Sequence, residues 1–461
     1  MNQSAEATDV AERGCGRCPR RAEARAASGA ARAWTVRMGL DVFRRLVSIG
    51  KRATDVGTEV SATMGIKAGL GYPIAIDFGV GSLKILQINP GEPPTLAAAA
   101  CLETPEELIK KPAERLQFQS QNLPRLIREG GFKGKRAVCA IPAWKTMCKN
   151  IQFAKQDGLS TAALVGGAIQ TQLNLDPFTM VHRHIEVQTG AMGKTEVIVV
   201  AAERDLVDKL VGAIHGAKLQ PVGMQSEFDA MLVAFGHINR RDEDKDKSTL
   251  LLDLGSTTTK VAICHGKSMV FARVIEFGGR NLDATIADQL GCSLAEARRR
   301  RMALDDKMAT ATADVVPKVV VGSSTPLEPR GDGQPERRER KLPRGVSGDV
   351  VADETIAVAP KEADLSDALE MLTDEILMCL RYHGSQFAGR KLDRAIFVGG
   401  ESRHRGLCQH IARKIRMPAH MADPMAWVAR TGDEQTIGVD LKKPQPGWAV
   451  ALGLCLSPTD L

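Results

Sequence analysis

Two stretches of the chain combine an acidic residue, glycines, hydroxyl side chains and a lysine in the same order. The first reads IDFGVGSLK at residues 76–84, and the second reads LDLGSTTTK at residues 252–260. In each stretch an aspartate follows an apolar run that predicts a buried strand, and a glycine-containing turn leads into a second apolar run. Backbone N–H groups and hydroxyls of such turns can point at phosphate oxygens. The pattern therefore predicts two phosphate-binding turns.

A third turn completes the candidate nucleotide site. Residues 398–402 read VGGES after another predicted strand, and they offer backbone without side chains where a flat adenosine could lie. The expected cofactor-binding residues are Asp77, Gly79, Gly81, Ser82, Lys84, Gly255, Ser256, Thr257, Thr258, Gly399, Gly400 and Glu401.

A metal ion and a set of catalytic candidates follow from the same pattern. Asp77 and Asp253 are expected to lie opposite each other near a Mg²⁺ ion held largely through water, because Mg²⁺ prefers few carboxylates plus phosphates. Hydrolysis requires a water oriented for in-line attack, and the candidates for orienting it are Asp253, Glu227 and Gln225.

The elements that must position these residues occur twice along the chain. One Asp-x-Gly turn is a weak signal, since most are simply tight turns. Two such turns at matched places in two similar halves indicate a shared cleft. The expected divisions are a basic flexible arm at 1–70, a first-lobe core at 71–147, a small subdomain at 148–221, an interlobe helix and linker at 222–247, a second-lobe core at 248–270, a second small subdomain at 271–390 with a disordered loop at 310–363, and the adenosine motif with a C-terminal helix at 391–461.

Composition limits the classes of protein that the chain can belong to. With 461 residues, 43% hydrophobic and 25% charged, it is long enough for two lobes with real cores. The low aromatic share of 4% argues against a surface that stacks nucleic-acid bases. The net charge is +7, but residues 1–70 hold twelve Lys and Arg against seven Asp and Glu, so the body is close to neutral. The ten cysteines are scattered and read as reduced cytosolic thiols.

Two local features keep alternative readings open. A predicted amphipathic helix around residues 42–56 could lie on lipid or pack on the protein itself. The basic run at residues 298–301 (RRRR) could contact a nucleotide, or it could be a solvated helix face.

No apolar run reaches the length of a membrane span, so we expect a cytoplasmic protein.

Together these motifs resemble the actin-like ATPase superfamily, and within it the PilM family of type IV pilus assembly proteins, relatives of the cell-division protein FtsA. The resemblance covers residues 72–456 and is carried by IAIDFGVGSLKIL, VCAIPAWKTMCKNIQF, LLLDLGSTTTKVAI, FGGRNLDATIADQLGCSLAEAR and FVGGESRHRGL, in the family's order. It implies an α/β fold of the actin-like type, with two duplicated lobes and four subdomains around a nucleotide cleft. The implied cofactors are ATP and Mg²⁺.

Two positions depart from the family pattern. Val80 stands where the family usually has a small hydroxyl residue, which removes one donor from the first turn. Gln225 stands where the family usually has an aspartate, although Glu227 remains close by. We therefore expect ATP binding with weak or absent hydrolysis.

The resemblance also implies a role and a partner. The chain would be an ATP-binding cytoplasmic scaffold, peripheral to the inner membrane, that docks the N-terminal peptide of a PilN-like membrane protein in a type IV pilus or a related type II secretion platform. A contact with the pilus motor ATPase is a further implication. The docking groove would lie between the strands of the small subdomain and the helix predicted at 160–173. Its apolar candidates are Leu173, Leu175, Pro177 and Phe178.

Two other functions are compatible with this superfamily. A small-molecule kinase would need a catalytic aspartate base on the substrate side of the cleft, and the sequence offers no obvious one. An FtsA-like membrane-tethered cytoskeletal protein usually carries a C-terminal amphipathic anchor. This chain stops at SPTDL directly after its last predicted helix, which argues against that class.

Overall fold

The computed structural model describes most of the chain from residue 72 onward. The described residues are 72–154, 158–173, 175–176, 178–187, 194–239, 244, 246–311 and 363–457, with the side chains of 304–311 excepted. The arm expected at 1–70, nearly all of the loop expected at 310–363, and Pro177 lie outside the described residues.

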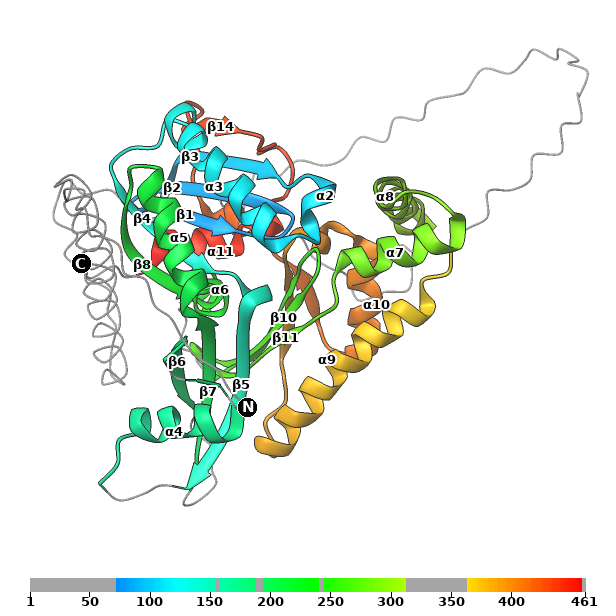
Figure 1. The fold of residues 1–461 in the computed structure, drawn as a ribbon. Helices are drawn as coiled ribbons and strands as arrows, with labels where there is room; N and C mark the ends of the chain where they lie inside the picture. The colour runs from blue at the N-terminus through cyan, green and yellow to red at the C-terminus, as the bar shows by residue number, and fades with distance from the viewer. Residues whose placement is uncertain are drawn as a thin grey trace, which may run out of the picture. The chain divides into compact units, whose positions relative to one another are not determined.

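The first lobe is built on a sheet of six strands in the order β14-β3-β2-β1-β4-β8 (Figure 1). Its strands are β1 (Ile74–Phe78), β2 (Ser82–Asn89), β3 (Thr95–Glu103), β4 (Arg136–Ile141), β8 (Gln220–Ser226) and β14 (Gln435–Ile437). The first three form an antiparallel meander, and β4 and β8 continue the sheet in parallel. Every residue of β1 is buried, as expected for a central strand that is covered on both faces.

The second lobe repeats this plan. Its five strands are β9 (Ser248–Leu254), β10 (Thr259–His265), β11 (Ser268–Ile275), β12 (Arg394–Val398) and β13 (Ala419–Met421). Their order, β11-β10-β9-β12-β13, matches β3-β2-β1-β4-β8 strand for strand, with the same antiparallel meander followed by two parallel strands. The duplication expected from the sequence is therefore present in the sheets.

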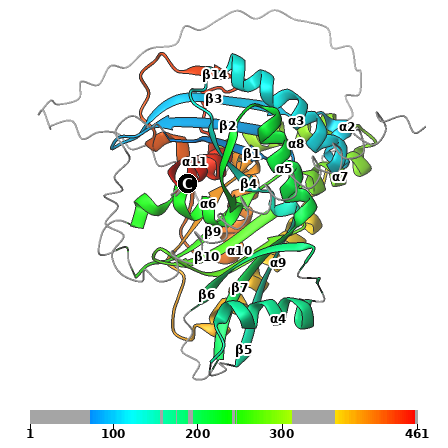
Figure 2. The same cartoon turned by 60° about the vertical axis from the view of Figure 1, so that its left-hand side comes forward.

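Helices cover both faces of the first sheet. On one face, α3 (Pro112–Glu129) and α5 (Arg204–Gly216) contribute apolar side chains to a core that also holds β1. On the other face lie α6 (Glu227–Ala234) and α11 (Ala449–Leu456). Because Met231 of α6 belongs to the core of the second sheet, this helix joins the two lobes (Figure 2).

The second sheet is covered by helices that come from the later part of the chain. These are α7 (Gly279–Leu290), α9 (Ser366–Gln386) and α10 (Arg405–Ile415), and α8 (Leu294–Ala311) packs against α7 and α10. Leu282, Ile376 and Ile411 carry the apolar faces of α7, α9 and α10 into the core around β9 and β12.

A separate three-stranded sheet forms the small subdomain. It consists of β5 (Thr146–Ala154), β6 (Met180–Val187) and β7 (Lys194–Glu203), paired antiparallel in the order β5-β7-β6. Helix α4 (Thr161–Leu173) covers one face, where Val165 and Ile169 pack against Ile151 and Val197 (Figure 2).

The remaining short helices are α2 (Glu106–Ile109), η1 (Ala143–Lys145), η2 (Gly236–Asn239), η4 (Gly400–Arg403), η5 (Pro424–Trp427) and η6 (Pro446–Trp448). Among the described helices, none has both the length and the apolar character that crossing a membrane requires.

Candidate functional site

A cavity of about 710 Å³ lies where the two Asp-Gly hairpins meet the turn after β12. The carboxyl ends of β1 and β9 open into it, which is where α/β sheets usually bind ligands. All twelve of the residues expected to bind the nucleotide line this cavity, from Asp77 in the first turn to Glu401 in the third. The structure thus brings together residues that lie more than 300 positions apart in the sequence.

The two hairpins place an aspartate and a lysine side by side in the same way. Asp77 is the register partner of Lys84 across β1 and β2, and Asp253 is the register partner of Lys260 across β9 and β10. Directly opposite residues on one face of an antiparallel pair are close enough to interact. Lys84 Nζ lies 3.5 Å from Asp77 Oδ2, and Lys260 Nζ lies 2.6 Å from Asp253 Oδ2. In each hairpin the aspartate and the lysine seven residues later therefore form an ion pair.

Both lysines keep their charge in the fold. Burial disfavours the ammonium of Lys84, but Asp77, with smaller contributions that include Asp253, outweighs it and raises the pKa of Lys84. Burial also disfavours the ammonium of Lys260, and here Asp253 and Glu227 together raise the pKa well above its usual range. Each hairpin thus places a charged ammonium group, paired with its aspartate, in the cavity wall.

Glu227 stands at the start of α6 and has both carboxylate oxygens engaged. The N-cap Ser226 accepts a hydrogen bond from the N–H of Asp229 at 3.1 Å, which fixes where the helix begins. Glu227 Oε1 accepts the N–H of Ala143 at 2.9 Å, and Oε2 pairs with Lys260. Burial raises the pKa of Glu227, with Lys260 opposing that effect. The side chain is therefore held rigidly in the cavity wall.

Gln225, the third catalytic candidate, does not line the cavity. It lies within β8, and its side-chain oxygen accepts a hydrogen bond from Ser457 Oγ at 2.7 Å, beyond the end of α11. Two of the three catalytic candidates, Glu227 and Asp253, are thus brought to the site, and Gln225 is placed elsewhere.

The second Asp-Gly turn is fixed by hydrogen bonds from the start of α7. Gly255 N–H donates to Thr258 O at 3.0 Å within the turn. The first backbone N–H groups of α7, those of Gly279 and Arg280, donate to Gly255 O and Ser256 O at 3.1 and 2.8 Å. Within the described part of the chain, the buried Ser256 Oγ has no hydrogen-bond partner. A buried unpartnered hydroxyl is costly, so this hydroxyl is available to donate a hydrogen bond to a group that enters the cavity.

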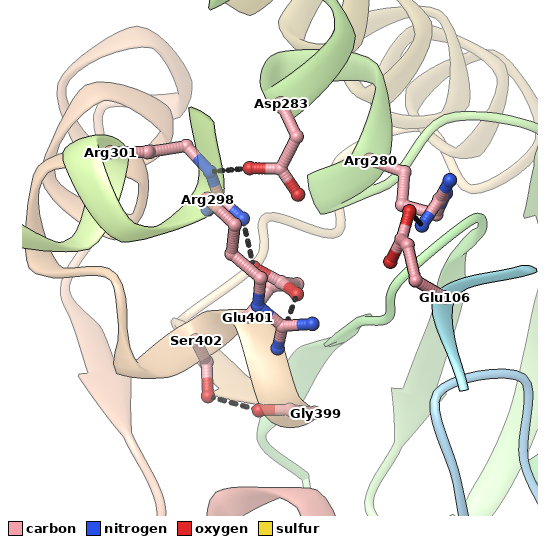
Figure 3. A network of polar contacts seen from close by, with 8 residues as sticks. All are labelled: Glu106, Arg280, Asp283, Arg298, Arg301, Gly399, Glu401 and Ser402. Carbon is pink, nitrogen blue, oxygen red and sulfur yellow. Dashed lines mark hydrogen bonds and ion pairs between the residues drawn. The ribbon is translucent and has the colours of Figure 1, made fainter. Parts of the chain in front are cut away.

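The third turn is held by a buried network of charges (Figure 3). Arg301 is fully buried, and it donates from Nε to Asp283 Oδ1 at 2.7 Å and from Nη2 to Glu401 Oε2 at 2.8 Å. Arg298 Nη2 lies 3.8 Å from Glu401 Oε1 and borders the cavity. The basic run therefore has divided roles, because Arg301 fixes Glu401, Arg298 faces the site, and Arg299 pairs with Glu296 on the helix surface.

A second contact joins the lobes at the rim. Arg280 Nη1 on α7 lies 2.5 Å from Glu106 Oε1 on α2, so an ion pair links elements of the two halves (Figure 3). The Arg280 side chain is 11% exposed and that of Glu106 is 42% exposed.

Sequence reasoning missed several of these residues. Lys260 could have been found, because it repeats the seven-residue spacing of Asp77 and Lys84. The buried role of Arg301 and the ion pair between Glu106 and Arg280 carry no local signal, because their partners are distant in sequence.

Of the two aspartates expected near a magnesium ion, Asp253 is crowded at both oxygens by other groups. Its Oδ2 is taken by Lys260, and its Oδ1 lies against Gly399, where a Cβ would come within 2.3 Å of that oxygen. Gly399 has a φ of +92°, a conformation that L side chains rarely adopt, so this close approach depends on glycine. In the described part of the chain, no group of three or more His, Cys, Asp or Glu residues could hold a metal ion.

Two lobes with the same sheet order, around a cavity lined by paired Asp-Gly hairpins, define an actin-like ATPase fold. A family model described as type IV pilus assembly protein PilM matches residues 75–309, and a model of cell division protein FtsA matches residues 250–453. The chain belongs to the PilM family of type IV pilus assembly proteins. The resemblance stated from the sequence is thereby confirmed.

The chain is similar to several solved structures. One titled "PilM-PilN type IV pilus biogenesis complex" matches with a TM-score of 0.60 and 20% identity, over 84% of this chain and 98% of that chain. Ethanolamine utilization protein EutJ from Carboxydothermus hydrogenoformans matches with a TM-score of 0.43 and 12% identity, over 84% and 90%. MreB 5 of Spiroplasma citri, in a structure bound to AMPPNP, matches with a TM-score of 0.37 and 11% identity, over 82% and 93%.

Proposed function

We propose that the chain is an ATP-binding scaffold of a type IV pilus assembly platform, or of a related type II secretion platform, and that it docks the N-terminal cytoplasmic peptide of a PilN-like inner-membrane protein. The observation that carries the nucleotide part is the convergence of two phosphate-type turns on one cavity. Membership of the PilM family supports the proposed place in a pilus assembly platform and the proposed PilN-like partner.

In this proposal the triphosphate lies between the two hairpins. The turn at Gly79, Gly81 and Ser82 supplies backbone N–H groups and a hydroxyl from one side, and Ser256 with its neighbours supplies them from the other. Lys84 adds a fixed charge, and the adenosine lies along Gly399 and Gly400. The unpartnered Ser256 Oγ supports this placement, because a phosphate oxygen would accept its hydrogen bond.

Hydrolysis is expected to be weak or absent. A general base needs a free oxygen within reach of the attacking water. Both oxygens of Glu227 are engaged by Ala143 and Lys260, and Asp253 Oδ2 is engaged by Lys260 as well. The same fact gives no support to the kinase alternative, which needs a free carboxylate base in the cleft.

We place the docking site on the small subdomain. Leu173 and Leu175 pack against its core, whereas Phe178 is 87% exposed just beyond α4. A large exposed aromatic side chain is the kind of residue that anchors a peptide. We assign Phe178 as that anchor, and membrane association then comes indirectly through the partner. A contact with the pilus motor ATPase remains a proposal without assigned residues.

Peptide binding tests the docking proposal. Synthetic N-terminal peptides of PilN-like proteins are titrated against the full chain and the Phe178→Ala variant, and we expect the variant to bind about tenfold more weakly, since an interface anchor contributes about 1–2 kcal/mol. The matched control is Met371→Ala on α9, which removes another exposed apolar side chain, 59% exposed, from a different lobe. Equal affinity of Phe178→Ala and the unaltered chain would contradict the assignment.

A further inference from the structure

Strand β6 is an edge strand of the small subdomain. It pairs with β7 on one side, and no other described strand pairs with it on the outer side, since the order of the sheet is β5-β7-β6 (Figure 1). Within β6 only the last residue, Val187, is buried, whereas most of β7 is buried. An exposed edge of this kind is a template for pairing with a further chain.

The register shows which backbone groups of β6 point outward. In an antiparallel pair, residues whose N–H and C=O face the partner strand alternate with residues whose groups face away. Just before β6, the N–H of Arg204 donates to the carbonyl oxygen of Thr179 at 2.9 Å, and every second residue from Thr179 onward therefore bonds to β7 along an unbroken register. The residues between them, His182, His184 and Glu186, direct their N–H and C=O groups toward the open edge.

This edge continues directly from Phe178. Phe178 lies two residues before the start of β6, and it is 87% exposed. Its carbonyl oxygen accepts a hydrogen bond from Arg204 Nε at 3.2 Å, which fixes the backbone where the strand begins. A strand of eight residues is about 25 Å long. An extended segment laid along β6 would thus meet an aromatic anchor at one end and a row of backbone donors and acceptors beyond it.

We propose that the docked peptide binds as an added strand along β6, with its backbone paired to His182, His184 and Glu186 and an apolar side chain against Phe178. This inference rests on the proposed docking of the N-terminal peptide of a PilN-like protein at Phe178. Main-chain hydrogen bonds then supply much of the affinity, and alternate side chains of the peptide supply the specificity. Because the edge and Phe178 form one continuous surface, the occupant that we assign is this peptide and not a second copy of the chain.

A backbone scan of the peptide tests the pairing directly. Synthetic N-terminal peptides of a PilN-like protein, each N-methylated at one backbone position, are titrated against the full chain. N-methylation removes one N–H donor and keeps every side chain, and in an added strand every second N–H faces β6. We expect losses of at least about tenfold at alternate positions of the bound segment and of less than about threefold at the positions between them. Similar losses at adjacent positions, or no loss at any position, would overturn the proposal.

A variant of the chain tests the same contact from the other side. His184→Pro removes one outward N–H, and proline is tolerated on an edge strand where the N–H faces away from the neighbouring strand. We expect this variant to bind the unmodified peptide at least about tenfold more weakly than the unaltered chain. The matched control, His184→Ala, removes the imidazole but keeps the N–H, and it should bind within about threefold of the unaltered chain. Equal affinities of the two variants would contradict strand pairing. A melting curve checks that His184→Pro folds, and the peptide scan does not depend on it.

The outcomes separate this inference from the function on which it rests. An unmodified peptide that does not bind removes the proposed docking and the inference with it. A peptide that binds and loses affinity in Phe178→Ala, but shows no alternation in the scan, leaves the docking in place and removes only the added strand. Sedimentation of the chain alone covers the other occupant. A dimer that is lost in His184→Pro would identify a second copy on this edge and overturn the proposal.

Discussion

Several charged side chains that line the cleft are engaged by other charges of the same chain. In the cleft, Glu401 is held by the fully buried Arg301, and Glu227 is held by Lys260. Buried pairs of this kind contribute less to stability than to fixing one geometry, because desolvation offsets much of their attraction. They keep the lining of the cavity in place before any ligand arrives. The groups that remain available to contact a ligand are the backbone of the turns, a hydroxyl and a few fixed charges.

A histidine pair outside the cleft gives stability a dependence on pH. His265 Nε2 and His383 Nε2 lie 2.8 Å apart, so one ring donates its proton to the other. Burial, with Arg390 and His383 adding to it, lowers the pKa of His265 to about 4 from its ordinary value of 6.5. The folded chain therefore keeps His265 neutral where the unfolded chain binds a proton. This contribution to stability is complete above about pH 6.5 and is lost as the pH falls toward 4.

Urea unfolding at pH 7.5 and at pH 5 checks this prediction. The unaltered chain should lose stability on acidification, and His265→Phe should lose less, because the ring that resists protonation is gone. The control His215→Gln changes an exposed histidine at the end of α5 and should keep the full pH dependence. If His265→Phe unfolds with the same pH dependence as the unaltered chain, the prediction is wrong.

At the scale of elements, the pair formed by α6 and α11 connects the site to both lobes. Helix α6 begins at Glu227 in the cavity wall, and α11 packs between it and the first sheet. The two helices approach closely at Gly453, where a Cβ would come within 1.7 Å of the carbonyl oxygen of Ala230. The position of Glu227 therefore depends on a packing contact between residues that do not line the cavity.

Two glycine substitutions in helices should have opposite effects. Gly453→Ala forces the helices apart and should destabilise the chain by about 1–3 kcal/mol, the usual cost of overpacking. Gly212→Ala in α5 meets nothing within 4 Å and should stabilise it by up to about 1 kcal/mol, because alanine favours the helix. Urea denaturation measures both. Similar free energies of unfolding for the two variants would contradict the close packing of α6 and α11.

The sequence predicted those elements whose residues carry a local signal. The strands β1 and β9, which carry Asp77 and Asp253 next to their last residues, have strongly apolar patterns followed by glycine turns, and the sequence predicts both. Strand β3 reads TLAAAACLE, and its alanines have low strand propensity, so its place in the sheet depends on pairing with β2. Gln225 was misplaced for a similar reason, since its direction is set by the packing of β8 near Ser457. A local sequence pattern specifies whether a segment is a strand, a helix or a turn. The direction of a side chain and its distant contacts depend on packing in the assembled core.

For the whole molecule, the ion pair between Glu106 and Arg280 links the two lobes at the rim of the cavity. Its members come from α2 and α7, and Glu106 also lines the cavity. A ligand that enters or leaves the cavity would pass close to this pair. Because Glu106 is partly exposed, water and salt weaken the ion pair. Its contribution to the free energy should not exceed about 1 kcal/mol.

Nucleotide release should respond to the loss of this pair. Glu106→Gln removes the charge but keeps the shape, and we expect a fluorescent ATP analogue to dissociate up to about fivefold faster, as a loss of about 1 kcal/mol implies. Stopped-flow displacement measures the rate. Glu107→Gln, at an exposed neighbour on the same helix, is the control and should leave it unchanged. A rate for Glu106→Gln equal to that of the control would show that the pair does not retain the nucleotide.

The central claim is that one nucleotide lies between the two Asp-Gly hairpins, and calorimetric titration of ATP into the full chain and into Lys84→Met tests it most directly. We predict one ATP per chain, with affinity at least about tenfold weaker in Lys84→Met, because the ammonium that faces the phosphates is lost. A folded chain that gives no heat of binding, or a Lys84→Met variant that binds as tightly as the unaltered chain, would contradict it.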